Sequence, residues 1–184
     1  CGYTDPRDNH FAQLSYDYTL AKTSAGNRSF LQQLPQWARF QCGDFEVLAC
    51  HGSPRRVNEF LWESNSSDAF LNRLLDQFDC DVLLCTHTGI KWHRALGGRR
   101  HVINVGALGR PENDGTQNVW YTSLRPEGSE LKVDFVPVEY EAERLAFEMR
   151  REGLPDEFIE TTLTGWWTTC LEVLPARERS KGIH

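Results

Sequence analysis

The sequence predicts a mixed α/β fold, and two observations carry that prediction. Two short apolar runs, residues 45–50 and 81–85, each end in turn-forming residues, as buried strands of an α/β sheet do. Between them lies a segment that Ser66 or Ser67 can cap, and its apolar residues recur at helical spacing: Phe70, Leu71, Leu74, Leu75 and Phe78. A strand, a helix and a second strand in this order predict a parallel pair joined by a crossover.

Turn-forming residues indicate the structure of the segment that precedes the first apolar run. Residues 1–27 are polar, contain closely spaced turn residues, and are expected to form a polar loop region. Asn27 is a candidate N-cap for a short helix that Pro35 ends. Residues 37–50 then have the pattern of a β-hairpin or of a strand entry.

The second half of the chain changes to β-like segments, separated by turns that contain Gly or Pro. These segments are expected to be antiparallel strands that continue the same core: residues 101–104, 118–124 and 131–140. Two helices follow in the prediction. Residues 141–152 form the first, with Gly153 as its C-cap, and residues 154–163 form the second.

The composition is that of a single globular domain over residues 1–184. Hydrophobic residues make up 40% of the chain, enough for a core, and the net charge is −6. No basic stripe is present that would bind nucleic acid, and no apolar run is long enough to span a membrane. Residues 165–184 are interpreted as a C-terminal extension, in which Trp166 and Trp167 either cover the core or form an exposed anchor for a protein partner.

The six cysteines are expected to be reduced thiols. No Cys-x-x-Cys pair is present, and three cysteines lie in or beside the apolar runs: Cys50, Cys80 and Cys85. With no signal peptide in the sequence, this pattern predicts a cytoplasmic protein. The chain has no initiator methionine and begins like the middle of a loop, so we expect it to be the carboxyl-terminal part of a longer protein.

Two histidines directly follow the two apolar runs. His51 opens the sequence His-Gly-Ser-Pro-Arg, and His87 lies in Thr-His-Thr-Gly. Because the carboxyl ends of neighbouring parallel strands meet at one edge of a sheet, both imidazoles are candidate ligands of one metal ion. The alternative for each is a histidine at the edge of the core that bonds a backbone carbonyl or ends its strand. Two histidines alone are too few ligands for a catalytic metal site.

A third strand end carries a glycine-rich turn. Asn104 is followed by Val-Gly-Ala-Leu-Gly and then by Arg110 and Pro111. Exposed backbone amides and a guanidinium together suit a phosphate group, and the alternative is an ordinary loop. The Gly-Lys-Ser/Thr ending of a P-loop is absent.

These three blocks, in this order, resemble the calcineurin-like metallophosphoesterase superfamily, and in particular its small bacterial phosphodiesterase-like branch. The resemblance covers residues 34–140, more than half of the chain. It implies a two-layer mixed β-sandwich flanked by helices, with two divalent metal ions at the strand ends. Mn²⁺, Fe or Zn²⁺ would suit the mixed imidazole and oxygen ligands of such a site.

Carried over residue by residue, the resemblance makes His51 and His87 ligands of the second metal ion. The family's histidine ligand to the first ion falls on Gly89, which has no side chain that could coordinate. Water or the nearby His93 would then replace that ligand. The alternative for His93 is an ordinary solvated loop histidine.

The resemblance also assigns phosphate-binding roles. Arg55 and Arg110 would face the phosphate, and Asn104 would support the metal ligands or orient the turn that follows it. The family's upstream blocks, Asp-x-His, Gly-Asp and Gly-Asn-His-Asp, are not found in the expected place. The catalytic residues are therefore expected ahead of residue 1. We expect a missing segment or a neighbouring chain to cover the sheet that their absence exposes.

The resulting hypothesis is a metal-dependent phosphoesterase in the full-length protein. It would hydrolyse a small phosphomonoester or phosphodiester with a hydroxide that two metal ions activate. The present chain alone is expected to be weak or inactive. The alternative is a non-catalytic metal- or phosphate-binding scaffold protein on the same fold, since a fold does not guarantee an activity.

Overall fold

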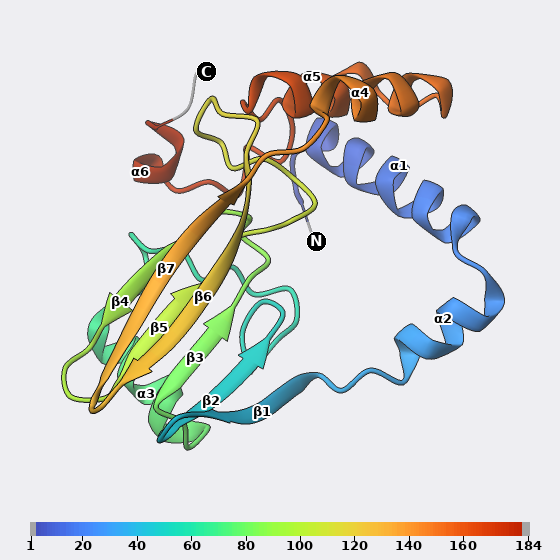
Figure 1. Cartoon of the computed structure of the whole chain (residues 1–184). Coiled ribbons are helices and arrows are strands. Elements are labelled where there is room, and N and C mark those ends of the chain that lie inside the picture. Colours follow the sequence, from blue (N-terminus) through green and yellow to red (C-terminus); the bar gives the residue numbers. More distant parts are fainter. Residues whose placement is uncertain (1–2, 182–184) are drawn as a thin grey trace.

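The structure is a computed structural model that describes residues 3–181, and its elements are labelled in Figure 1. The strands are β1 Trp37–Cys42, β2 Phe45–Cys50, β3 Val82–Cys85, β4 Trp92–Ala95, β5 His101–Asn104, β6 Val119–Glu127 and β7 Glu130–Val138. The helices are α1 Pro6–Lys22, α2 Ala25–Gln32, α3 Asp68–Gln77, α4 Ala142–Arg151, α5 Asp156–Thr164 and α6 Ala176–Arg179. The strands form a five-stranded sheet of order β1-β2-β3-β5-β4 and a separate hairpin, β6-β7.

The centre of the large sheet is parallel. Strand β2 pairs with β3, and β3 with β5, in parallel, whereas β1 and β4 are antiparallel edge strands. The predicted parallel unit β2-α3-β3 is therefore confirmed, and the Ser67 side chain caps α3 by accepting a hydrogen bond from the backbone N–H of Phe70. As a consequence, the carboxyl ends of β2, β3 and β5 lie at the same edge of the sheet.

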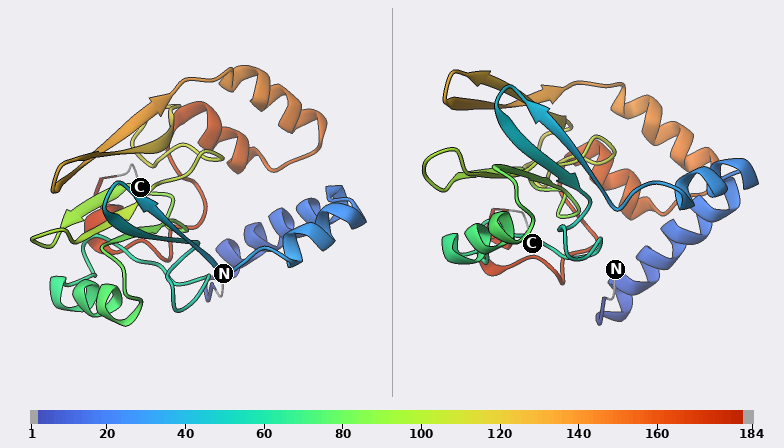
Figure 2. Two further views of the ribbon diagram at one scale, coloured as in Figure 1. Left: turned by 60° about the horizontal axis from the view of Figure 1, so that its bottom comes forward. Right: turned by 90° about the horizontal axis from the view of Figure 1, so that it is seen from below.

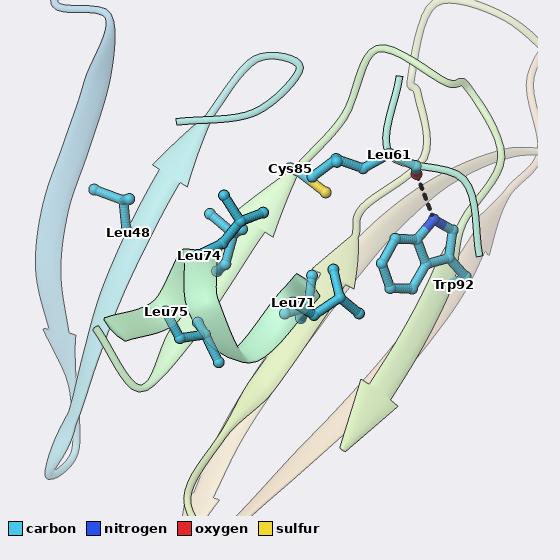
Figure 3. Packing of buried hydrophobic residues seen from close by; sticks show 9 residues of the cluster. Leu48, Leu61, Leu71, Leu74, Leu75, Cys85 and Trp92 are labelled. Atoms are coloured by element: carbon cyan, nitrogen blue, oxygen red, sulfur yellow. Dashed lines mark hydrogen bonds between the residues drawn. The ribbon is translucent and has the colours of Figure 1, made fainter. Parts of the chain in front are cut away.

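The large sheet is covered on both faces, by α3 on one and by the β6-β7 hairpin on the other (Figure 2). Figure 3 shows the core on the α3 side, where the indole N–H of Trp92 donates to the carbonyl of Leu61 at 3.0 Å. The core on the hairpin side contains Phe45, Val47, Val82, Ile103 and Leu131. The predicted two-layer mixed β-sandwich flanked by helices is confirmed.

Two predictions about the sheet are wrong in detail. Residues 101–104 form a strand, but it lies parallel to β3 and not antiparallel. Strand β4 is absent from the prediction, because its four residues, Trp-His-Arg-Ala, form a sheet edge that is only partly buried and shows no apolar run. In the second half of the chain, two strand pairs are antiparallel: β6 with β7, and the edge strand β4 with β5.

The polar loop region expected over residues 1–27 is largely helical instead. Helix α1 begins where the Asp5 carboxylate accepts a hydrogen bond from the N–H of Asp8, with Pro6 as its first residue. Its sequence shows no apolar stripe because only Asp8 and Phe11 are buried. The next helix, α2, is capped by Ser24 and not by the predicted Asn27.

Helix α1 is fastened to the C-terminal part of the chain at both of its ends. The buried Asp8 carboxylate accepts hydrogen bonds from the backbone N–H groups of Cys170, at 2.7 Å, and Glu172, at 2.9 Å. At the other end of the helix, Lys22 forms an ion pair with Glu152 at 2.5 Å, just after α4. These contacts place α1 beside α4 and α5 (Figure 1).

The C-terminal segment packs against the body of the protein. Trp167 is buried in a third apolar cluster with Trp62, Ile90 and Leu174, which confirms the core-covering interpretation for that residue. Trp166 is partly buried, over Gly115. The cysteines of the described residues are free, namely Cys42, Cys50, Cys80, Cys85 and Cys170, whereas Cys1 lies outside the described residues. Within residues 3–181, no helix is both long and apolar enough to cross a membrane.

Candidate metal centre

His51 and His87 meet at the carboxyl edge of the parallel strands. They directly follow Cys50 at the end of β2 and Thr86 after β3. The Nε2 atom of His51 lies 2.9 Å from Nδ1 of His87, and the ring centroids are 4.9 Å apart. The structure therefore brings together the two histidines that the sequence singled out.

The backbone of both turns enters the left-handed region, at Gly52 in one and at His87 in the other. Gly52, directly after His51, has φ +73°, and a Cβ there would lie 2.5 Å from the carbonyl oxygen of Val57. His87 itself has φ +76°, a region that non-glycine residues rarely adopt. Backbone strain of this kind recurs at functional sites, where the surrounding structure holds it in place.

Asn104, at the end of β5, supports the turn that carries His87. Its side chain is fully buried; Nδ2 donates to the carbonyl of Thr86 at 3.2 Å, and Oδ1 accepts from the N–H of Gly106 at 3.2 Å. The Thr86 hydroxyl donates in turn to the carbonyl of Gly106 at 2.7 Å. These contacts tie the turn that carries His87 to the end of β5.

A cavity of about 190 Å³ opens over the histidine pair, and we call it the histidine cavity. Its walls include Phe60, whose ring centroid is 4.3 Å from that of His87. Burial, and after it the neighbouring His51, lowers the pKa of His87 to about 4, and burial also lowers the pKa of His51. Both imidazoles are therefore neutral near pH 7, the form that binds metal ions.

The residues present fit a metal ion, as two of its ligands. The buried Nε2 of His87 has no hydrogen-bond partner among the described residues, so no contact on that side of the ring fixes its tautomer, and Nδ1 is open to bind a metal ion. Two imidazole nitrogens bound to one ion at about 2.0–2.1 Å lie about 2.9–3.4 Å apart for bond angles of about 90–109°. The observed separation of 2.9 Å falls at the short end of that range.

No third protein ligand completes the pair within the part of the chain that the structure describes. Residues 3–181 contain no group of three or more His, Cys, Asp or Glu side chains that could hold a metal ion. His93, the predicted substitute for the ligand missing at Gly89, pairs instead with His101 at 2.9 Å and does not line the histidine cavity. His93 lies on β4, and its ring stacks on that of His101 of the neighbouring strand β5. It therefore does not lie at the carboxyl edge of the parallel strands.

The two predicted phosphate-binding arginines are placed differently. Arg110 lines the histidine cavity, stacks over Trp167 with 4.0 Å from Cζ to the ring centroid, and donates to the carbonyl of Thr169 at 3.1 Å. Arg55 does not line it, because its guanidinium forms an ion pair with Glu59 and lies over Phe70. The structure thus brings Arg110 to the histidines but not Arg55.

Several residues at the histidine cavity carried no signal in the sequence. Phe60 and Trp167 form apolar walls, and Tyr3 and Cys170 come from the two ends of the chain. For Trp167 the sequence indicates only a tryptophan that either covers the core or is exposed. A hydrophobic pattern within one segment cannot locate such residues, because long-range packing alone brings them to the site.

Neither a family model nor a curated protein matches the sequence. The fold, however, is similar to that of several solved structures, including the following two. The hypothetical protein PH1004 from Pyrococcus horikoshii matches with a TM-score of 0.68 and 21% identity, over 82% of this chain and 59% of that one. A metallophosphoesterase from Sphaerobacter thermophilus matches with a TM-score of 0.63 and 23% identity, over 90% of this chain and 72% of that one.

This chain has a metallophosphoesterase-like fold. The fold that the resemblance implied is thus confirmed. The chain spans 59% of the length of PH1004. Within the metallophosphoesterase-like fold, the histidine pair and Arg110 occupy the carboxyl edge of the parallel strands, the position at which such sheets build their sites.

Proposed function

We propose that this chain is part of a metal-dependent phosphoesterase, in which His51 and His87 hold one divalent cation. The observation that carries the proposal is the 2.9 Å approach of the two ring nitrogens at the ends of adjacent parallel strands. The metallophosphoesterase-like fold supports the same reaction class. The remaining coordination positions would belong to water, to substrate oxygens or to protein groups outside residues 3–181.

Each residue of the site has a distinct role in the proposal. When bound, a divalent cation lowers the pKa of a coordinated water and polarises a phosphoryl oxygen. His51 and His87 would position that cation, and Asn104 keeps the His87 turn in place. Arg110, half-buried and stacked on Trp167, would bind the phosphate and stabilise the negative charge that develops on it.

A second candidate function has an observation of its own. The space beside Gly89, where the family's histidine ligand to the first ion falls, is filled by the indole of Trp167. Without a histidine at position 89, the site lacks the family's ligand to the first ion. This loss favours the scaffold alternative, a protein that binds a metal ion or phosphate without hydrolysing an ester.

The test compares three histidine variants. Metal bound per chain is measured by elemental analysis after gel filtration with Mn²⁺ or Zn²⁺, for H51A, H87A and the matched control H93A, whose histidine lies outside the histidine cavity. The proposal expects one ion per chain, lost in H51A and H87A and kept in H93A. Equal metal content in all three variants would refute it.

Hydrolysis of bis-p-nitrophenyl phosphate by the same proteins separates the two functions. Turnover that is slow, but clearly above the H51A background, supports the phosphoesterase. Metal binding that depends on His51, without any hydrolysis that depends on it, supports the scaffold alternative. Rapid turnover by this chain would overturn the expectation that its two histidines provide only part of a site.

A further inference from the structure

A second cavity, of about 380 Å³, adjoins the histidine cavity, and we call it the helix cavity. It lies between α1, α5 and the turn that follows Asn104. Its apolar walls are formed by Phe11, Ala12, Met149 and Phe158. No Asp or Glu belongs to the described residues that line it. Its volume is within the range of about 300–1,000 Å³ that is usual for small-molecule sites.

The two cavities share one wall. Three residues line both of them: Tyr3, Arg110 and Cys170. Arg110 is the charged member of this wall. Of its five N–H donors, one is occupied by the Thr169 carbonyl and a contact to the Cys170 thiol is also made, but no carboxylate within residues 3–181 forms an ion pair with it. A half-buried guanidinium with spare donors and no carboxylate partner can bind an anion from either side.

Two of the hydroxyl groups that line the helix cavity already form hydrogen bonds within the protein. The Thr162 hydroxyl donates to the carbonyl of Phe158 at 3.1 Å, and the Thr161 hydroxyl pairs with that of Thr168 at 3.5 Å. The protons of these two hydroxyls are therefore used within the protein, which leaves only their oxygen lone pairs for a ligand. An apolar group gains from burial in such a cavity, whereas a polyhydroxylated group would lose its hydrogen bonds to water.

We infer that the helix cavity binds the organic group of the substrate, which makes the substrate a phosphate ester of an apolar group the size of an aromatic ring system or a short acyl chain. The phosphate would lie at the histidine pair and Arg110, and the ester group would extend past Arg110 into the space between α1 and α5. The inference rests on the proposed function, and it adds the substrate class.

The test measures the affinities of two probes, 1-naphthyl phosphate and inorganic phosphate, by calorimetry in the presence of Mn²⁺. Two variants obstruct the helix cavity: A12F fills its interior, and S15W blocks it from the exposed side of α1. Because Ser15 is exposed, S15W should fold even if A12F does not. The matched control is Q13F, which adds a ring of the same size as A12F one residue further along α1, at an exposed position outside the cavity.

The inference expects 1-naphthyl phosphate to bind at least about tenfold more tightly than inorganic phosphate to the unmodified chain, from the apolar surface that it buries. S15W, and A12F where it folds, should remove that advantage, and Q13F should keep it. Equal affinities in the unmodified chain, or an advantage that survives both A12F and S15W, would overturn the inference.

Failure of the proposed function would look different. In that case the metal content would not depend on His51, whatever the two probes show in A12F and S15W. An R110M variant adds an internal check, because loss of the shared guanidinium should weaken both probes together, by about tenfold. An unchanged affinity of both probes in R110M would also count against the inference.

Discussion

The indole of Trp167 lies against Gly89 so closely that a Cβ at position 89 would be 3.1 Å from Cζ2 of the ring. Gly89 also has φ +71°, which a side chain would strain. Two independent features therefore close this position to a larger residue. Within this packing, residue 89 cannot supply the histidine that would bind a first metal ion.

Replacement of Gly89 by histidine should therefore destabilise the protein without adding a metal ligand. We expect G89H to lower the free energy of unfolding by about 2 kcal/mol or more, from backbone strain and displacement of Trp167. Urea unfolding and metal content are the measurements. G97H is the matched control, because Gly97 has φ +90° but no atom within 4 Å of the place that a Cβ would take, so that variant reports backbone strain alone. A G89H protein that keeps its stability and binds an additional ion would contradict this prediction.

Removal of the Asn104 side chain should weaken metal binding from a distance. N104A leaves the carbonyl of Thr86 and the N–H of Gly106 without their partner, at a cost of about 1–3 kcal/mol in stability. The His87 turn should loosen, and Mn²⁺ affinity should fall by about 10–100-fold, as for other residues that orient a metal ligand. Calorimetric titration with Mn²⁺ measures this fall. N72A is the control: its amide bonds the Asp68 carbonyl on α3, and its Mn²⁺ affinity should be unchanged.

The pair His93 and His101 predicts the pH dependence of stability. Burial lowers the pKa of both imidazoles, and His101 lowers that of His93 further. Below the ordinary histidine pKa of about 6.5, the unfolded chain therefore binds more protons than the folded chain, so stability rises with pH and is lost on acidification. Urea midpoints at several pH values between about 5 and 7.5 should show a smaller slope in H93Q than in the unmodified chain. The exposed His10 gives the control H10Q, and equal slopes in the two variants would rule out the pair as a source.

The exposed apolar side chains of α2 should promote self-association. Phe30 and Leu31 are 62% and 54% exposed, and no residue of this helix is buried. Large exposed apolar patches on one face favour association in water. The double variant F30S/L31S should therefore show a lower weight-average mass by light scattering at high concentration. L108S, which removes an equally exposed leucine from a different part of the chain, should leave that mass unchanged.

The elements that could be predicted from the sequence are those whose signal is local. Apolar runs located β2 and β3, and helical spacing located α3, because each of these elements buries a continuous face. Helix α1 buries little beyond Phe11 and is held by hydrogen bonds of Asp8 to distant backbone, so its sequence resembles a loop. Strand β4 is short, charged and at an edge, which leaves no periodic signal.

The residues of the candidate site also divide into those with a local sequence signal and those without one. His51 and His87 could be predicted because each directly follows a buried strand, and parallel strands bring such residues together. The exclusion of Arg55 could not, because it depends on the carboxylate of Glu59 four residues away competing for the guanidinium. Nor could the approach of Trp167 to the site, since no local pattern relates a tryptophan to a strand end far earlier in the chain.

The bonds from Asp8 to Cys170 and Glu172 have a consequence for the order of assembly. The wall between the two cavities draws Tyr3 from one end of the chain and Cys170 from the other. On the ribosome, the parallel sheet can therefore form well before this wall exists. Contacts of such long sequence separation are also slow to form in isolated chains. Binding competence should thus arise only after residues 170–172 have emerged, and later than the sheet that carries the two histidines.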